Sequence, residues 1–195
     1  MSAGKDPVDA FLALVASKGF AEVTLRDVAR ESGLGLAELY GNHPNKVSLL
    51  AAFMARIDAQ VLAGTPSAVD PEETARDRLF DTMMRRYDAL KSHRAVLGSL
   101  WRAAARDPLF AAALLPVLRK SMSAMIEAAG IPSDGAMGAL RQKGLLVIHL
   151  AVGRTFENDD SVDLSKTMAA LDRRLKDAER WVQLIEKYAI YRSVA

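Results

Sequence analysis

The chain of 195 residues contains no cysteine and only three histidines, His43, His93 and His149, which lie far apart in the sequence. The lack of cysteine excludes disulfides, thiolate zinc sites and cysteine nucleophiles. The spacing of the histidines argues against a histidine-rich metal centre. The net charge is only +2, with 26 basic and 24 acidic side chains, so the overall charge does not indicate a nucleic-acid-binding protein.

Targeting signals and long hydrophobic runs are also missing. The first ten residues are polar and include two aspartates, whereas a secretory signal needs a basic start followed by an apolar stretch. The uncharged apolar run at residues 144–153 is about half of the ~20 residues that span a bilayer. We therefore expect no transmembrane segment and a cytoplasmic protein.

Catalytic motifs are not evident either. The sequence has no Gly-x-Ser-x-Gly elbow, no glycine-rich phosphate loop before a helix and no His-Glu-x-x-His pair. The acidic pair Asp159 and Asp160 falls in an expected loop. We predict that the protein is not an enzyme, has no catalytic or metal-binding residues and uses no cofactor.

What the sequence does contain is a strong helical pattern. Half of the residues are hydrophobic, which suffices for a packed core, and the common residues Ala, Leu, Arg, Met and Glu favour helices. No segment shows the alternation of a strand. We predict an all-α fold with helices over residues 8–18, 25–32, 36–41, 46–62, 71–91, 93–106, 108–129, 134–156 and 164–192.

Two short helices near the N-terminus are joined by a glycine turn. Thr24 stands where a helix cap is expected, with Asp27 three residues later, as in a capping box. Gly33 and Gly35 bracket the turn, and a second short helix follows from Leu36. This arrangement predicts a helix-turn-helix, in which the second helix enters the DNA major groove.

The segment GFAEVTLRDVARESGLGLAELYGNHPNKVSLL, residues 19–50, resembles the DNA-binding domain of the TetR family of bacterial transcriptional regulators. The residues that fit the family pattern are Gly19, Phe20, Thr24, Val28, Ala29, Gly33, Leu39, Tyr40, Pro44, Lys46 and Leu49. The resemblance implies an N-terminal three-helix DNA-binding domain over residues 1–45 and a helical ligand-binding and dimerisation domain over residues 46–195.

The resemblance also implies which residues face a double-stranded DNA operator. The positions that contact phosphates in the family are occupied here by Thr24, Arg26, Tyr40 and Lys46, and contacts to base edges are expected from the recognition helix. The predicted DNA-binding residues are Thr24, Arg26, Gly35, Leu36, Ala37, Glu38, Tyr40, Asn42, His43 and Lys46. The alternative for Thr24 and Tyr40 is that the first only caps its helix and the second only packs.

The recognition helix departs from the family pattern in its chemistry. Gly35 replaces the usual serine cap, Gly41 stands where a basic residue is common, and Asn42-His43 replaces His-Phe. The helix has no lysine or arginine and carries Glu38, whose carboxylate suits a cytosine amino group. Residues 1–50 hold five basic and six acidic side chains, whereas a DNA-binding head is normally basic.

In TetR-like proteins the C-terminal helices enclose an effector. The bulky apolar residues of this half imply an apolar small molecule or lipid, because methionine suits adaptable apolar sites. The predicted pocket residues are Met83, Met84, Tyr87, Trp101, Phe110, Leu114, Met122, Met125 and His149. The alternative is that they form ordinary core, with His149 hydrogen-bonded inside it.

The last two expected helices are long and carry apolar faces. They suit a homodimer built as a four-helix bundle, or they pack only on their own core. The tail LDRRLKDAERW also resembles a lipid-binding accessory family of ubiquinone biosynthesis, which has a TetR-like fold and is not known to read DNA. The basic block at residues 91–130 suits a lipid surface as well.

The sequence thus predicts a TetR-like DNA-binding regulator, a repressor that a small apolar ligand releases from its operator. The alternative is a lipid- or isoprenoid-binding accessory protein of ubiquinone biosynthesis that binds no DNA.

Overall fold

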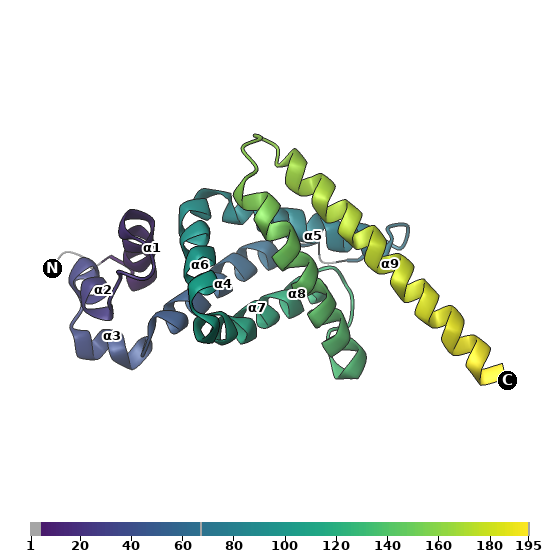
Figure 1. The fold of residues 1–195 in the computed structure, drawn as a ribbon, viewed down its shortest axis with the longest axis horizontal. Helices are drawn as coiled ribbons and strands as arrows, with labels where there is room; N and C mark the ends of the chain where they lie inside the picture. Colours follow the sequence, from purple (N-terminus) through teal and green to yellow (C-terminus); the bar gives the residue numbers. More distant parts are fainter. Residues whose placement is uncertain (1–4, 67, 195) are drawn as a thin grey trace. The chain divides into compact units, whose positions relative to one another are not determined.

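The computed structural model describes residues 5–66 and 68–194, with side chains described as far as Arg180. The part of the chain that it describes is helical and contains no strand, so the predicted all-α fold is confirmed (Figure 1). The helices are α1 (Pro7–Lys18), α2 (Leu25–Ser32), α3 (Leu36–Asn42), α4 (Lys46–Ala63), α5 (Ala75–Leu90), a 3-10 turn η1 (Lys91–His93), α6 (Arg94–Arg106), α7 (Pro108–Ala128), α8 (Gly135–Glu157) and α9 (Ser165–Val194).

Local side-chain chemistry sets the ends of the N-terminal helices. Asp6 caps α1 by accepting hydrogen bonds from the backbone N–H groups of Val8 and Asp9. Helix α1 ends at Lys18 and is followed by Gly19, whose φ of 87° favours glycine. The predicted capping box of α2 is present, with Thr24 and Asp27 each satisfying the other's backbone N–H.

The start of α5 differs from the sequence prediction. We expected the helix to begin at Pro71, but it begins at Ala75. The reason is a second capping arrangement: the Thr74 hydroxyl accepts the N–H of Asp77 at 3.1 Å and donates to its carboxylate at 2.7 Å. The Thr74 hydroxyl thereby satisfies an N–H group in the first turn of the helix. Pro71 has no side-chain acceptor and cannot form such a cap.

The chain packs as two compact units. The first contains Met1–Gln60 and Ala89–Ser121, and the second contains Val61–Asp88 and Met122–Ala195. The buried core of the first unit is formed by residues such as Phe11, Leu39, Leu49 and Phe53, and that of the second by residues such as Met83, Tyr87, Met122, Met125 and Leu171. These units describe packing, whereas the predicted division after residue 45 concerns function and stays a prediction.

Helix α7 is unusually apolar. Among the described residues it is the one helix long and apolar enough to cross a membrane by length and composition, with a mean hydropathy of 1.4 over an 18-residue window of which 22% is buried. Arg119 and Lys120 interrupt its apolar residues, so it contains no uncharged run of the ~20 residues that span a bilayer. A single helix of this kind is a weak indication, since helices of soluble proteins pass the same test.

Candidate DNA-binding surface and effector core

Helix α3 is held in the first unit by a single buried side chain. Leu39 is fully buried, whereas Leu36 and Tyr40 are 43% and 59% exposed. Since a helix turns about 100° per residue, Ala37 and Gly41 lie nearly opposite Leu39, and both are exposed. The outward crest of α3 is therefore built from very small residues.

Different side chains flank this crest. Leu36 and Tyr40 lie on one side of it, and Glu38 and Asn42 lie on the other, as the helical spacing requires. All four are exposed. Gly35 begins the helix with no side-chain cap, as expected for a residue without a hydroxyl. His43 ends the helix by donating its N–H to the Leu39 carbonyl at 2.7 Å.

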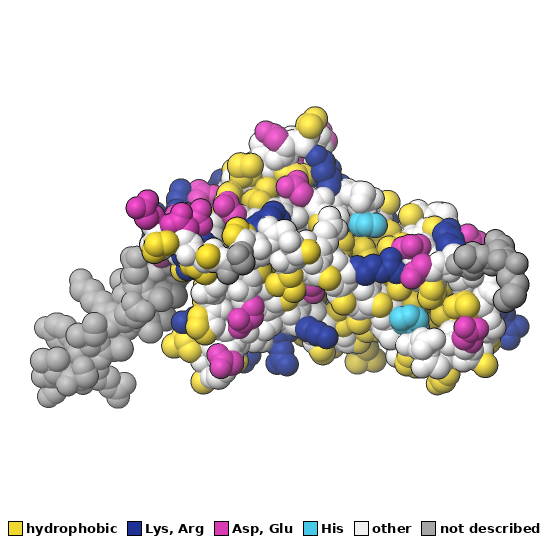
Figure 2. Space-filling model, turned by 180° about the vertical axis from the view of Figure 1, so that it is seen from behind, with side chains coloured by type: hydrophobic (Ala, Val, Ile, Leu, Met, Phe, Trp, Pro, Cys, Tyr) yellow, Lys and Arg dark blue, Asp and Glu magenta, His cyan; other side chains and the backbone are white. Residues whose placement is uncertain are grey.

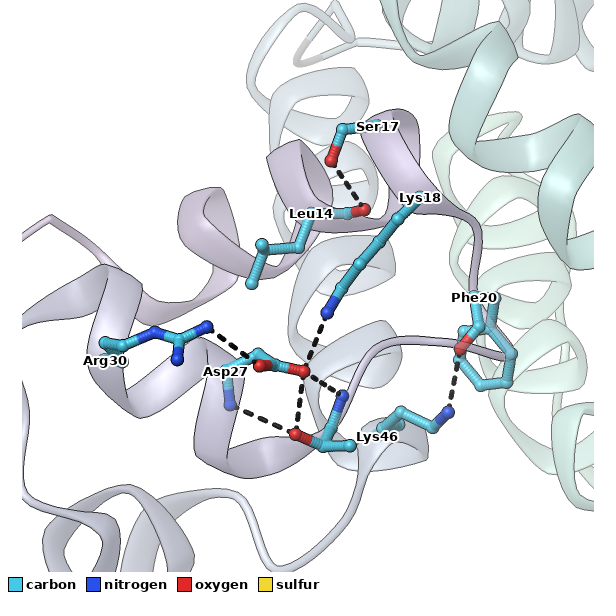
Figure 3. Close-up of polar contacts among 8 residues, drawn as sticks. Leu14, Ser17, Lys18, Phe20, Asp27, Arg30 and Lys46 are labelled. Carbon is cyan, nitrogen blue, oxygen red and sulfur yellow. Dashed lines mark hydrogen bonds and ion pairs between the residues drawn. The ribbon is translucent and has the colours of Figure 1, made fainter.

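Asp27 is the centre of a polar cluster at the start of α2, together with Lys18 and Arg30 (Figure 3). The Thr24 hydroxyl donates to the Asp27 carboxylate at 2.8 Å, and the ammonium of Lys18 donates to the same oxygen at 2.8 Å. Arg30 pairs with the other carboxylate oxygen at 3.1 Å. The Lys18 ammonium, followed by the hydrogen bonds from Thr24, holds the pKa of Asp27 well below its usual range.

Lys46 is directed into the first unit. Its ammonium donates to the carbonyl oxygen of Phe20 at 2.8 Å and lies 4.2 Å from the centre of the Phe20 ring (Figure 3). Burial lowers the pKa of Lys46 from its ordinary value. The side chain that the sequence analysis assigned to phosphate contact thus already holds a backbone oxygen in this structure.

Most cations of the N-terminal helices have an acidic or carbonyl partner. Lys5 pairs with Glu31 at 3.2 Å, in addition to the contacts of Lys18, Arg30 and Lys46. Arg26 is exposed and makes no ion pair or side-chain hydrogen bond within the described part of the chain. On the face drawn in Figure 2, basic and acidic side chains are interspersed and do not gather in one basic patch.

Phe20 connects the helix-turn-helix segment with α6 and α7. Its ring stacks on Phe110 of α7 with centroids 4.4 Å apart and meets Phe11 of α1 edge-on at 6.3 Å. Its backbone N–H donates to the Ser99 hydroxyl of α6 at 2.8 Å. These contacts could not be predicted from the sequence, because Ser99 and Phe110 are about 80 and 90 residues away from Phe20 along the chain and no local pattern relates them.

The predicted pocket residues divide between the two compact units. Trp101, Phe110 and Leu114 lie in the first unit and are partly exposed. The remaining six lie in the second unit and are buried: Met83, Met84, Tyr87, Met122, Met125 and His149. We call these six residues the methionine core.

The polar groups of the methionine core are Tyr87 and His149. The Tyr87 hydroxyl and His149 Nδ1 share a hydrogen bond of 3.1 Å, and Phe156 packs on the Tyr87 ring at 5.1 Å between centroids. Burial, and then the nearby charge of Arg86, lowers the pKa of His149 to about 3. Burial raises the pKa of Tyr87 well above its usual range. Both groups are therefore neutral at physiological pH.

Arg86 is a buried residue that the sequence analysis missed. Its side chain is fully buried, beside the His149 whose pKa it lowers. A signal was present, since Arg86 is three residues from Met83 and four from Leu90 and so occupies the apolar face of α5. An arginine at an inward position supplies a fixed positive charge inside the buried core of the second unit.

Comparisons with known proteins agree with the helix-turn-helix of the N-terminal segment and with the fold of the longer chain. Residues 8–53 match the model of the bacterial regulatory proteins of the tetR family. This segment is a TetR-type helix-turn-helix domain. The match begins in α1 and ends in α4, so it contains all of α2, α3 and the glycine turn between them.

Solved structures extend the similarity beyond the TetR-type domain. A TetR transcriptional regulator from Nitrosomonas europaea is 22% identical, with 89% of this chain and 95% of that chain covered and a TM-score of 0.68. A TetR regulator from a Rhodococcus species is 24% identical, with 87% and 93% covered and a TM-score of 0.58. The FadR regulator of Bacillus subtilis, solved with stearoyl-CoA, is 16% identical, with 87% and 95% covered and a TM-score of 0.51. No curated protein matches this chain. The chain therefore has the fold of TetR-family regulators over nearly its whole length.

The neutral, buried His149 makes the stability of this TetR-fold protein depend on pH. An unfolded histidine takes up a proton as the pH falls below about 6.5, whereas folded His149 does so only near pH 3. Stability is therefore lost as the pH falls through 6.5. Between pH 7 and pH 5 this effect lowers the free energy of unfolding of the wild type by about 2 kcal/mol. We expect His149→Gln to lack this part of the pH dependence, as measured by urea unfolding at each pH.

A matched control separates this effect from simple loss of packing. Tyr87→Phe removes the hydrogen bond to His149 but keeps the buried imidazole, so it should lower stability at both pH values and leave the pH dependence unchanged. His93, whose pKa is also lowered by burial, adds a loss of the same sign, which remains in the His149→Gln variant. An equal pH dependence in wild type and His149→Gln would contradict a neutral, buried His149.

Proposed function

We propose that this protein is a DNA-binding transcriptional repressor that an apolar small molecule or lipid releases from its operator. The observation that carries the proposal is the exposed face of α3, opposite the buried Leu39, within the TetR-type domain. In a helix-turn-helix the second helix enters the major groove and its outward side chains meet the bases. The functional boundary after residue 45 belongs to this proposal.

In this proposal the TetR-type domain holds DNA with few cations. Arg26 supplies the main phosphate contact, because the other cations already have partners in the protein. Thr24 and Tyr40 contribute hydroxyl groups, and contact of Lys46 with phosphate requires its ammonium to leave the Phe20 carbonyl. Phosphate contacts position the domain on the duplex, whereas base contacts select the sequence.

The operator is bound by a homodimer that forms through α8 and α9. Helix α8 exposes Met137, Leu140 and Val147 to 58%, 59% and 66%, and with Gly144 they recur at spacings of three and four residues. This is the seam of a coiled coil, and nothing within the described structure approaches the place of a Cβ at Gly144. The seam accepts the same seam of a second copy. On α9, Met168 is 40% exposed, and the side chains beyond Arg180 lie outside the described residues.

The effector occupies the methionine core of the second unit. Four flexible methionine side chains can repack around an apolar molecule, and Tyr87, His149 and Arg86 supply polar contacts. The structural similarity to FadR, which was solved with stearoyl-CoA, supports a lipid-like effector. The ubiquinone-biosynthesis alternative is not favoured, since the family model and the solved structures compared above are those of transcriptional regulators.

Helix α7 offers a route from effector to DNA. It carries Met122 and Met125 of the methionine core as well as Phe110, which stacks on Phe20. Phe20 in turn is tied to Lys46 at the start of α4. The effector favours one arrangement of α7 over another only if it binds the two arrangements with different affinity.

The central prediction concerns DNA affinity and its dependence on salt. The logarithm of the binding constant should fall linearly with the logarithm of the salt concentration, because phosphate contacts release counterions. Arg26→Ala should make this slope shallower by about 1.8 for a dimer, since each lost phosphate contact contributes about 0.9. The measurement is fluorescence anisotropy of labelled duplexes in a KCl titration.

The control is Arg173→Ala, which removes an exposed arginine of α9 and should leave the slope unchanged. A wild-type protein with no salt-sensitive binding to any duplex would rule out the proposed function. An unchanged slope in Arg26→Ala, with normal wild-type binding, would remove only the role of Arg26.

A further inference from the structure

The recognition helix lacks the residues that most often read DNA bases. Residues 33–45 contain neither lysine nor arginine, whereas the commonest specific contact is a bidentate arginine or lysine on the O6 and N7 acceptors of guanine. Besides the hydroxyl of Tyr40 and the amide of Asn42, α3 offers the bases apolar side chains and the Glu38 carboxylate as a hydrogen-bond acceptor. The major groove offers a counterpart to each, namely the methyl group of thymine and the amino groups of cytosine and adenine.

The crest of α3 suits a close approach to the groove floor. Ala37 and Gly41 point outward, so no long side chain holds the helix away from the bases. Leu36 presents an exposed branched apolar side chain beside Ala37. Exposed apolar groups in this position lose contact with water when they meet a thymine methyl group, which stabilises the complex.

The opposite flank of α3 supplies an acceptor. Glu38 is exposed and has no side-chain hydrogen bond or ion pair within the described residues. The neighbouring Asn42 donates its side-chain amide to the Glu38 backbone carbonyl at 3.3 Å, and the Glu38 carboxylate is the charged acceptor on this flank. A carboxylate accepts a hydrogen bond from the N4 amino group of cytosine.

We propose that α3 selects its operator half-site by contacts of Leu36 and Ala37 with thymine methyl groups and of Glu38 with a cytosine amino group. This inference rests on the proposed DNA-binding function and adds the chemistry of the bases that are read. The carboxylate lowers affinity for every duplex through repulsion by phosphates and gains selectivity for cytosine in return.

The first test removes single methyl groups from the DNA. Full-length protein selects duplexes from a random-sequence pool, and the enriched duplex is resynthesised with uracil in place of each thymine in turn. We expect one or two positions in each half-site at which the change weakens binding about fourfold, the value for one methyl-sized group removed from contact. Uracil at the other thymines serves as the control within the same duplex.

A protein variant then assigns the methyl contact. Leu36→Ala keeps a good helix former on an exposed position, so folding is preserved. In this variant the penalty for uracil should vanish at the position that Leu36 contacts and persist at the others. Unchanged uracil penalties at every position would overturn the assignment to Leu36.

The second test changes the acceptor. Glu38→Gln should shift the preferred base at one position of each half-site from cytosine to adenine by at least about fivefold, because glutamine pairs with adenine N6 and N7. It should also bind random duplexes more tightly than wild type. Replacing the guanine opposite that cytosine by 7-deazaguanine removes its N7 acceptor and should leave wild-type binding unchanged.

The outcomes separate this inference from the function on which it rests. A pool that yields no enriched duplex and no salt-sensitive binding counts against DNA binding itself. An enriched duplex that tolerates uracil at every thymine, or that keeps its cytosine preference with Glu38→Gln, overturns the proposed base reading while DNA binding stands. Loss of binding on 7-deazaguanine substitution would show that guanine is read instead.

Discussion

Replacing Phe20 by alanine is expected to lower the free energy of unfolding by about 3–5 kcal/mol, the usual cost of removing a buried phenylalanine. The ring is 6% exposed, stacks on Phe110 and carries the Lys46 ammonium above its face. Alanine keeps the backbone bonds to Ser99 and Lys46 but loses these ring contacts and leaves a cavity. Urea unfolding followed by circular dichroism measures the change.

Two further variants test the separate contacts of Phe20. Phe20→Leu keeps much of the apolar volume and should cost clearly less than alanine. Ser99→Ala removes the acceptor of the buried Phe20 N–H and should cost about 1–3 kcal/mol. A loss below about 1 kcal/mol for Phe20→Ala would mean that the ring does not stack on Phe110 in solution.

The second large effect is expected on the dimer. Val147→Glu places a carboxylate in the exposed apolar seam of α8, and in the proposed dimer this charge is buried without a partner. An uncompensated buried charge costs about 3–5 kcal/mol, and the lower value already raises the dissociation constant more than a hundredfold. Light scattering at micromolar concentration should therefore find a dimer for wild type and a monomer for Val147→Glu.

The matched control is Val162→Glu, which places the same charge on a valine that is 89% exposed in the loop between α8 and α9. This variant should remain dimeric. Val147→Glu should also weaken operator binding, because a dimer engages two half-sites at once whereas a monomer holds one. A dimeric Val147→Glu protein would show that the α8 seam is not the interface.

The helix caps show which helix starts can be predicted from neighbouring residues alone. The box formed by Thr24 and Asp27 was predicted correctly, because its partners are three residues apart and the cap depends only on neighbouring backbone groups. The predicted start of α5 was wrong, although the same Thr-x-x-Asp pattern stands at Thr74 and Asp77. Pro71 also suits the first turn of a helix, and the two signals lie too close together for propensity to choose between them.

The candidate sites divide in the same way. The spacing of Leu39 and Tyr40 in a short helix already places one side chain inward and the other outward, so the exposed face of α3 follows from helix geometry. The partners of Lys46 and the methionine core do not follow, because they depend on which distant helices pack together. Arg86 lies between these cases, since its position on the apolar face of α5 is visible in the sequence but its burial is not.

The order of the residues alone was sufficient for the helical fold, the helix-turn-helix and the absence of cationic side chains from the recognition helix. These features depend on local propensity, capping and composition, which act over a few residues. The packed structure was needed to show that the Lys46 ammonium donates to the Phe20 carbonyl and that Phe110 stacks on the Phe20 ring. It was also needed to show that Arg26, among the described cations of the N-terminal helices, has no partner. Such contacts join residues up to 90 positions apart, and only the burial of several helices against one another brings them within reach.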